Sequence, residues 1–179
     1  MENTIPTKRQ AEEEENKFKR ILYTDASVAK ASDPAGEAAT GYIWYQRTEE
    51  GCWEEISKDS ANIGHGHSSY SAEAIAIRLG LENEPPKRGS SPDANSGIGI
   101  FTDSLSNLRT ISKGIAQTPE QENLLATIVN NHNSITFYHV RAHQDNTKNN
   151  DVDSLCNISS TNPDRKNKKH LEGLKTTSK

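Results

Sequence analysis

Two short apolar segments that lie far apart in the sequence each end in Thr-Asp followed by a small residue. The first is Lys-Arg-Ile-Leu-Tyr-Thr-Asp-Ala-Ser over Lys19–Ser27, and the second is Gly-Ile-Gly-Ile-Phe-Thr-Asp-Ser over Gly97–Ser104. Each pattern predicts a β-strand with an aspartate, Asp25 or Asp103, at or near its C-terminal end. If both strands deliver their aspartates to one edge of a sheet, the carboxylates come together. Carboxylates at close range repel one another unless they share a proton or a cation, so this edge predicts a divalent metal site.

The segments around these two strands predict the rest of a sheet. Strands are expected over Phe18–Thr24, Ala38–Gln46, Cys52–Asp59, Ile98–Thr102 and Ile135–Val140. Helices are expected from Ser71 or a neighbouring cap to Leu81, from Ser104 to Gly114, from Pro119 onward, and over Asn150–Ile158. The first three strands form an antiparallel meander, and helices alternate with the later strands. This order predicts an α/β fold, a mixed five-stranded sheet flanked by helices.

The length of 179 residues predicts one compact domain with polar tails. Residues 1–17 are polar and acidic, and we expect a disordered or frayed N-terminal tail there. Residues 18–158 form the predicted domain. Residues 159–179 are expected to be a basic, disordered C-terminal tail. Its cluster Arg165–Lys169 either binds nucleic acid, directs nuclear import or is simply solvated.

Charge and composition narrow the class of protein. The formal net charge of −4 differs from that of a typical free-standing nucleic-acid binder, although an acidic metal site also lowers the net charge. No apolar run approaches a membrane span, and the acidic N-terminus lacks the features of a secretory signal or a mitochondrial presequence. We therefore expect a monomer of the cytosol or nucleus with no membrane partner. Cys52 and Cys156 are expected to be thiols, with a single disulfide as the alternative.

Two further acids can join the aspartates at the strand ends. Glu73 lies near the start of the first long helix, and Asp153 lies in the last short helix, within Asn-Asn-Asp-Val-Asp-Ser-Leu-Cys. An aspartate that ends a strand is usually a turn former or a helix cap. Four acids on elements that can converge at the carboxyl ends of parallel strands instead predict a site for two Mg²⁺ or Mn²⁺ ions. Asp151 is a competing candidate for the fourth ligand.

Five motifs in order carry a resemblance to a known family. They are Tyr-Thr-Asp-Ala-Ser (Tyr23–Ser27), Ser-Ala-Glu-Ala (Ser71–Ala74), Phe-Thr-Asp-Ser (Phe101–Ser104), Val-Arg-Ala-His (Val140–His143) and the acidic motif of Asn149–Cys156. Each motif alone is weak, but the ordered set on matching predicted elements is specific. From Phe18 to Asn157 the chain resembles the type 1 ribonuclease H family, in character closest to the ribonuclease H domains of retroelements.

The resemblance implies an endonuclease that hydrolyses the RNA strand of RNA–DNA hybrids by a two-metal-ion mechanism with Mg²⁺ or Mn²⁺. It implies four catalytic carboxylates as metal ligands: Asp25, Glu73, Asp103 and Asp153. It places a catalytic His143 on a mobile loop that assists proton transfer or product release. Asp153 is preferred over Asp151, because Val152 and Leu155 then take the apolar positions of the motif. A reverse transcriptase or another partner domain is also implied.

Contacts to the hybrid are implied around the metal ligands, by Ala26, Ser27, Ser69, Tyr70 and Ser104. The chain departs from the family in this region. Ala26 stands where the family often has Gly, and Ser68–Tyr70 stand where Asn or Gln often contact the hybrid. The stretch between Gly114 and Pro119 is too short for the basic handle of some members, and Cys156 stands where Ala is usual.

Other functions share much of this pattern. One alternative is a catalytically inactive ribonuclease-H-like module that binds nucleic acid or protein. Another is a different nuclease or a transposase of the same superfold. The spacing of His65 and His67 suggests a metal site, but no cysteine or carboxylate partners them at zinc spacing, so a loop is the simpler interpretation.

Overall fold

The computed structural model describes residues 8–28, 37–86, 97–131, 133–140 and 146–161. Its five strands form a single sheet in the order β3-β2-β1-β4-β5. The strands are β1 (Arg20–Ser27), β2 (Ala38–Arg47), β3 (Trp53–Gly64), β4 (Ile98–Thr102) and β5 (Ile135–His139). Strands β1 to β3 are antiparallel neighbours, and β4 lies parallel between β1 and β5. The predicted mixed five-stranded sheet is confirmed.

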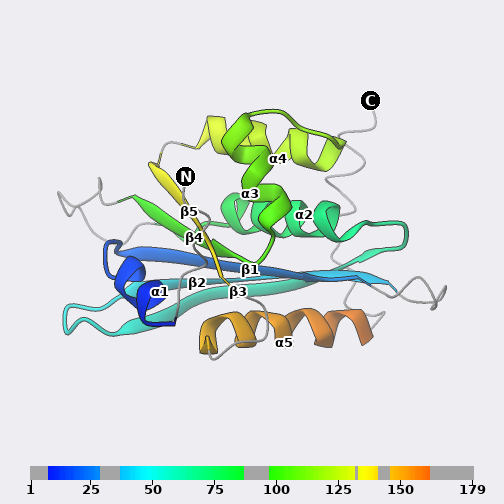
Figure 1. Ribbon diagram of the computed structural model, residues 1–179. Coiled ribbons are helices and arrows are strands. Elements are labelled where there is room, and N and C mark those ends of the chain that lie inside the picture. The colour runs from blue at the N-terminus through cyan, green and yellow to red at the C-terminus, as the bar shows by residue number, and fades with distance from the viewer. Residues whose placement is uncertain (1–7, 29–36, 87–96, 132, 141–145, 162–179) are drawn as a thin grey trace.

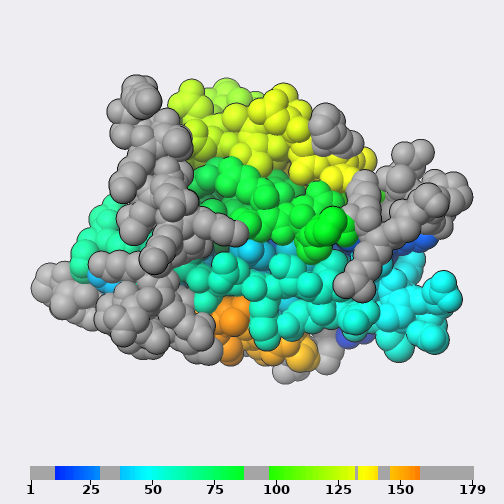
Figure 2. Space-filling view, turned by 180° about the vertical axis from the view of Figure 1, so that it is seen from behind, coloured from blue at the N-terminus to red at the C-terminus, as the bar shows by residue number. Residues whose placement is uncertain are grey.

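Helices cover both faces of this sheet. They are α1 (Lys8–Glu15), α2 (Ser69–Glu82), α3 (Leu105–Lys113), α4 (Pro119–Asn130) and α5 (Thr147–Thr161). Figure 1 shows α2, α3 and α4 above the sheet, and α5 below it with α1 beside its beginning. From behind, α3 and α4 again lie above the cyan strands β2 and β3, with α5 in orange beneath them (Figure 2). The fold is therefore a three-layer arrangement with the sheet in the middle.

The helix α2 packs closely on the centre of the sheet. Its N-cap is Ser68, whose side chain accepts a hydrogen bond from the backbone N–H of Ser71 at 3.3 Å. At Gly80 a β-carbon would lie 2.9 Å from a methyl carbon of Leu22, so only glycine allows this approach. The indole Nε1 of Trp44 donates to the carbonyl of Gly80 at 2.8 Å. Apolar burial and this contact fix α2 along the sheet.

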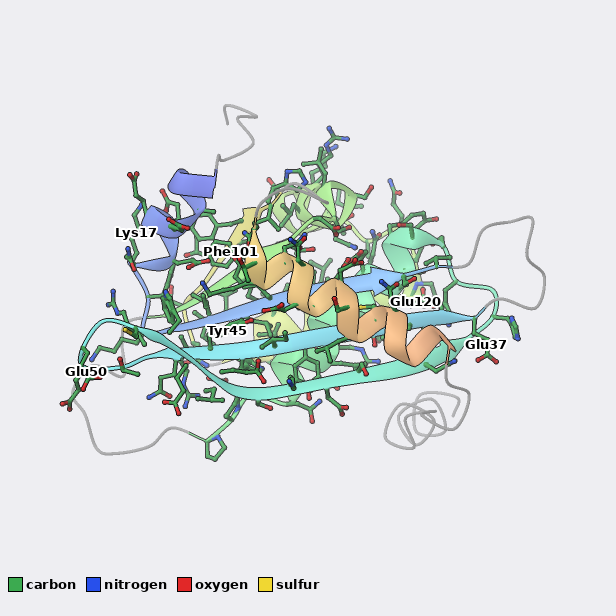
Figure 3. The ribbon with its side chains drawn as sticks, turned by 90° about the horizontal axis from the view of Figure 1, so that it is seen from below. Lys17, Glu37, Tyr45, Glu50, Phe101 and Glu120 are labelled. Atoms are coloured by element: carbon green, nitrogen blue, oxygen red, sulfur yellow. The ribbon has the colours of Figure 1, made fainter. Side chains whose placement is uncertain are left out.

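The opposite face of the sheet carries a second core. Its buried members come from the strands, from α5, from the segment between α1 and β1 and from the residue after β5: Phe18, Ile21, Tyr23, Ile43, Tyr45, Phe101, Val140 and Val152. Figure 3 looks at this face and shows α5 crossing the strands, with α1 near the end at which α5 begins. Both helices therefore lie on the same face of the sheet, where α1 can contact the beginning of α5.

Three boundaries differ from the expectation. β3 continues to Gly64, because its last residues pair with the start of β2. α5 begins at Thr147 and runs to Thr161, so it is longer at both ends than the predicted helix. Lys8–Glu15 forms a helix whose Ala11 and Glu15 are buried, so this segment is packed on the domain where a disordered tail or a frayed helix through Glu12–Lys17 is expected. The domain bounds 18–158 stay a prediction.

Both cysteines are free thiols, Cys52 exposed and Cys156 buried. This confirms the prediction of thiols over a disulfide. No helix within the described ranges is long and apolar enough to cross a membrane.

Candidate metal centre

Three carboxylates meet at one edge of the sheet. β1 and β4 are parallel, and Tyr23 pairs with Phe101, so Asp25 and Asp103 follow at matching positions. Glu73 comes from the N-terminal part of α2, above the same edge. One ligand oxygen from each of Asp25, Glu73 and Asp103 lies within 4.8 Å of the other two. The predicted convergence of these three side chains is present in the structure.

The backbone at the end of β1 helps to hold the cluster. The N–H of Ala26 donates to Asp25 Oδ1 at 2.8 Å and to Glu73 Oε1 at 3.2 Å. Glu73 is buried, and its second oxygen Oε2 has no hydrogen-bond partner in the described part of the chain. A buried carboxylate oxygen without a donor is costly, and a cation is the partner that best satisfies it. This oxygen and its neighbours therefore suit a divalent metal ion.

The electrostatics of the cluster lead to the same conclusion. Burial, followed by repulsion from Asp103, raises the pKa of Asp25 to about 8. Burial and then repulsion from Asp103 and Asp25 raise the pKa of Glu73 well above its ordinary value. Burial also raises the pKa of Asp103, although hydrogen bonds with the other two carboxyls and the nearby His139 oppose the shift. Near neutral pH the metal-free cluster therefore retains protons that a metal ion would displace.

Asp153 approaches this cluster from the opposite face of the sheet. Its carboxyl helps to raise the pKa of Asp25, after burial and Asp103, but it is not among the three carboxylates whose oxygens lie within 4.8 Å of one another. Val152 and Cys156 are fully buried on the sheet side of α5, and the Cys156 thiol donates to the backbone carbonyl of Asp25 at 3.3 Å. At Gly41 a β-carbon would lie 2.9 Å from that sulfur, so a glycine is needed for α5 to pack this closely.

Asp151 is placed differently from Asp153. It is exposed on α5, and its charge acts on Tyr45 rather than on the cluster. Asp153 is half-buried, and its carboxyl adds to the raised pKa of Asp25 after burial and Asp103. The geometry therefore favours Asp153 as the fourth ligand, which is still a prediction.

The predicted substrate contacts surround the three carboxylates. Ser27 is half-buried at the end of β1, and Ser69 is exposed at the start of α2. Tyr70 follows it and is 39% exposed, while its backbone carbonyl accepts from Asn107 Nδ2 at 2.8 Å. Ser104 is buried, and its hydroxyl accepts from the same amide nitrogen at 2.8 Å. Ser69 and Tyr70 can thus face a substrate, whereas the Ser104 hydroxyl is occupied within the protein.

Other residues singled out from the sequence are not described as part of the cluster. His143 and the basic cluster Arg165–Lys169 lie outside the described residues. His65 lies 3.5 Å from Glu37, and His67 contacts the carbonyl of Ile63, so neither is part of the carboxylate cluster.

Sequence reasoning missed His139, whose Nε2 lies 3.1 Å from the carbonyl of Asp103. It ends β5 opposite Thr102 of β4, the residue before Asp103. Its place at the C-terminal end of a parallel strand was a signal that could have identified it.

Comparison with solved structures identifies the fold. Foamy viral protease-reverse transcriptase in complex with dsDNA matches with a TM-score of 0.61 and 16% identity over 81% of this chain and 96% of that chain. RNase H1 from the halophilic archaeon Halobacterium salinarum matches with a TM-score of 0.55 and 16% identity over 78% and 96%. LC11-RNase H1 in complex with an RNA/DNA hybrid matches with a TM-score of 0.58 and 21% identity over 80% and 97%.

The chain has the ribonuclease-H-like fold, and it is similar both to RNase H1 structures and to a retroviral reverse transcriptase structure. The fold class and the resemblance predicted from sequence are confirmed at this level. Neither the models of protein families nor the curated proteins give a match to the sequence.

Proposed function

We propose that this chain is an endonuclease that hydrolyses the RNA strand of RNA–DNA hybrids with the help of divalent metal ions. The observation that carries the proposal is the convergence of Asp25, Glu73 and Asp103 within 4.8 Å at the carboxyl edge of the parallel strands. We propose Asp153 as the fourth ligand, supported by its influence on the pKa of Asp25, which is smaller than that of burial and Asp103. RNase H1 structures with the same fold support the reaction class.

Two Mg²⁺ or Mn²⁺ ions suit this set of ligands. When bound, such ions activate a water molecule for attack on the phosphodiester and stabilise the leaving oxygen. The protein's own contribution is to hold the carboxylates close together before the ions arrive. The backbone N–H of Ala26 bonds two of them, and burial excludes most of the water that would otherwise compete. The site is therefore preorganised, which is what electrostatic catalysis requires.

Recognition of the hybrid is proposed to involve the edge around the cluster. Ser69 and Tyr70 at the start of α2 are exposed beside it. A hybrid is distinguished from DNA by the 2′-hydroxyls of one strand, which a serine or a tyrosine can bond. The foamy viral match is a protease-reverse transcriptase, and this supports our proposal that a reverse transcriptase or another domain assists substrate binding.

His143 is proposed to assist proton transfer or product release. A general acid–base group contributes about 100- to 10,000-fold, and the effect expected here lies at or below the lower end of that range. We expect His143→Ala to slow turnover by about 10- to 100-fold without loss of Mn²⁺ binding. Calorimetry that showed Mn²⁺ binding lost in this variant would make His143 a ligand instead.

The test of the proposed function is a substrate panel. End-labelled RNA–DNA hybrid, RNA duplex and DNA duplex of one sequence are incubated with the full chain in Mg²⁺ and, separately, in EDTA. We expect cleavage of the RNA strand of the hybrid only, and only in Mg²⁺. A chain that binds the hybrid and never cleaves it would be the inactive binding module, and cleavage of the DNA duplex would indicate another nuclease of this fold.

A further inference from the structure

The sheet face that carries α5 has a row of aromatic rings beside that helix. The rings of Tyr23 and Phe101 are stacked with centroids 4.9 Å apart, and those of Phe101 and Tyr138 are stacked at 5.0 Å. Phe18, just after α1, meets Tyr138 edge-on at 5.9 Å. The row runs across β1, β4 and β5, and two of its members carry hydroxyl groups that need hydrogen-bond partners.

The helix α1 supplies those partners. Its inward side is Ala11, Glu14 and Glu15, at the spacing of one helical face, whereas Glu12 and Glu13 are exposed. Glu14 forms an ion pair with Lys17 at 2.7 Å and, after burial, contributes to the raised pKa of Tyr138 on β5. Glu15 is buried, and its Oε1 accepts from the Tyr23 hydroxyl on β1 at 2.6 Å. Of these two adjacent glutamates, Glu15 is the one with a 2.6 Å hydrogen bond to a strand.

Glu15 also contacts the beginning of α5, and Glu14 has no such contact among the described interactions. The ammonium of Lys148 donates to Glu15 Oε2 at 3.0 Å. The Tyr23 hydroxyl, which donates to Oε1, accepts from Asn146 Nδ2 at 3.2 Å. Asn146 is the cap of α5, because its Oδ1 accepts from the N–H of Asn149 at 3.1 Å. The two oxygens of Glu15 therefore hold the cap and the first turn of α5.

The surroundings of Lys148 make this contact specific. Its ammonium lies 5.6 Å from the ring centroid of Tyr45 and 6.0 Å from that of Trp53. Cation–π contacts and the carboxylate of Glu15 together fix the position of a long side chain that would otherwise be mobile. The charge of Glu15 is largely shielded from water, since its side chain is 4% exposed. A buried carboxylate of this kind needs both of its partners.

We propose that Glu15 is a positioning residue that, through Lys148 and Tyr23, holds α5 so that Asp153 reaches the carboxylate cluster. Asp153 lies about 10 Å along the helix from Asn146, at about 1.5 Å per residue. A helix is stiff over two turns, so the placement of its first turn determines where Asp153 stands at the edge of the sheet. The inference rests on the proposed function in that it takes the cluster to be a metal centre.

The test compares Glu15→Gln with its neighbour Glu14→Gln in the full chain. Glu15→Gln keeps the shape of the side chain and removes the charge that holds Lys148. Mn²⁺ affinity is measured by calorimetry without nucleic acid, and hydrogen exchange over α5 is measured without metal. We expect Glu15→Gln to weaken Mn²⁺ binding about fivefold and to speed exchange in the first turn of α5. Glu14→Gln should leave both within about twofold of wild type.

Tyr23→Phe provides a second variant that retains the stacked ring and so preserves the fold. It removes only the hydroxyl that links Glu15 to Asn146, and its Mn²⁺ affinity should fall between those of wild type and Glu15→Gln. Wild-type affinity and exchange in both Glu15→Gln and Tyr23→Phe would overturn the inference, as would an equal loss in Glu14→Gln. If Mn²⁺ binds as described while hybrids stay uncut, only the proposed function fails, and a wild-type chain that binds no Mn²⁺ overturns both.

Discussion

The two faces of the sheet are held to their helices by different kinds of contact. Against one face, α2 is fixed by close apolar packing. Gly80 packs directly on Leu22, and the indole N–H of Trp44 donates to the backbone carbonyl of Gly80. Against the other face, the beginning of α5 is fixed by polar contacts that pass through Glu15, a residue of a separate helix.

The candidate metal centre takes Glu73 from a helix on one face, and its proposed fourth ligand, Asp153, comes from a helix on the other. Glu73 comes from α2 and is almost fully buried, and Asp153 comes from α5 and is half-buried. Asp25 and Asp103 come from the strands between them. Close packing leaves Glu73 no alternative position. The helix of Asp153 also packs closely, through Val152 and Cys156, but its first turn is held in addition by polar contacts that single substitutions can remove. This difference predicts that substitutions on the two faces will change activity and stability by unequal amounts.

The largest difference is expected in activity. Glu73→Gln should reduce hybrid cleavage by at least about 1,000-fold, which corresponds to about 4 kcal/mol, because it removes a charge from the middle of the cluster. Asp153→Asn should reduce it by about 100-fold. Asp151→Asn is the matched control, because Asp151 lies two residues before Asp153 on the exposed side of α5. Its cleavage activity should stay within about twofold of wild type. Single-turnover rates in Mg²⁺ measure all three.

Two outcomes would contradict the predicted ranking of these variants. If Asp151→Asn lost more activity than Asp153→Asn, the fourth ligand would be Asp151, and α5 would have to turn relative to the described arrangement. If Glu73→Gln kept activity near that of wild type, the cluster would not be the catalytic site.

Neighbouring residues on β1 allow the stability of the two faces to be compared. Leu22→Ala opens a cavity beneath α2 and should lower the free energy of unfolding by about 3 kcal/mol. Tyr23→Phe keeps the aromatic stack on the other face and removes one buried hydrogen-bonded hydroxyl, for a loss of about 1 to 2 kcal/mol. Urea denaturation with a common slope measures both. A larger loss for Tyr23→Phe than for Leu22→Ala would mean that the polar face contributes more than the apolar one.

The pH dependence of stability reports on the edge that the two faces share. Asp25 has a folded-state pKa of about 8, above its unfolded value, so the folded protein binds more protons than the unfolded chain between these values. Stability of the metal-free protein therefore falls as pH rises through this window, by up to about 3 kcal/mol from about pH 5 to pH 7. In EDTA, Asp25→Asn should flatten this dependence and be more stable than wild type at neutral pH. A wild-type stability that rose with pH over this range would contradict the raised pKa.

Local sequence patterns predicted the elements whose positions are determined by apolar packing. The strands that end in Asp25 and Asp103, and the apolar stripe of α2 that carries Glu73, follow from periodicity and from turn and cap residues. The same reasoning treated the glutamates of α1 as a solvated acidic segment. Whether Glu15 is buried depends on Tyr23 and Lys148, which are distant in sequence, and no local pattern contains that information.

The choice between Asp151 and Asp153 and the position of His139 also depend on contacts that no local sequence pattern contains. The sequence offered Asp151 and Asp153 and favoured Asp153 by its motif, and their positions on α5 relative to Tyr45 and Asp25 favour the same residue. His139 lies beside Asp103 only because β4 and β5 pair in a particular register. Local order along the chain could be predicted, and contacts that depend on how helices dock on the second face could not.

Calorimetric titration of Mn²⁺ into the metal-free protein at neutral pH tests most directly whether the buried carboxylates form a metal centre. Wild type and Asp103→Asn are compared in two buffers with different ionisation enthalpies, so that released protons are counted along with affinity. We predict that wild type binds Mn²⁺ with net release of protons, because the cluster holds protons when it is empty, and that Asp103→Asn binds at least about 100-fold more weakly. Equal affinity in Asp103→Asn, or binding to wild type without proton release, would contradict the account.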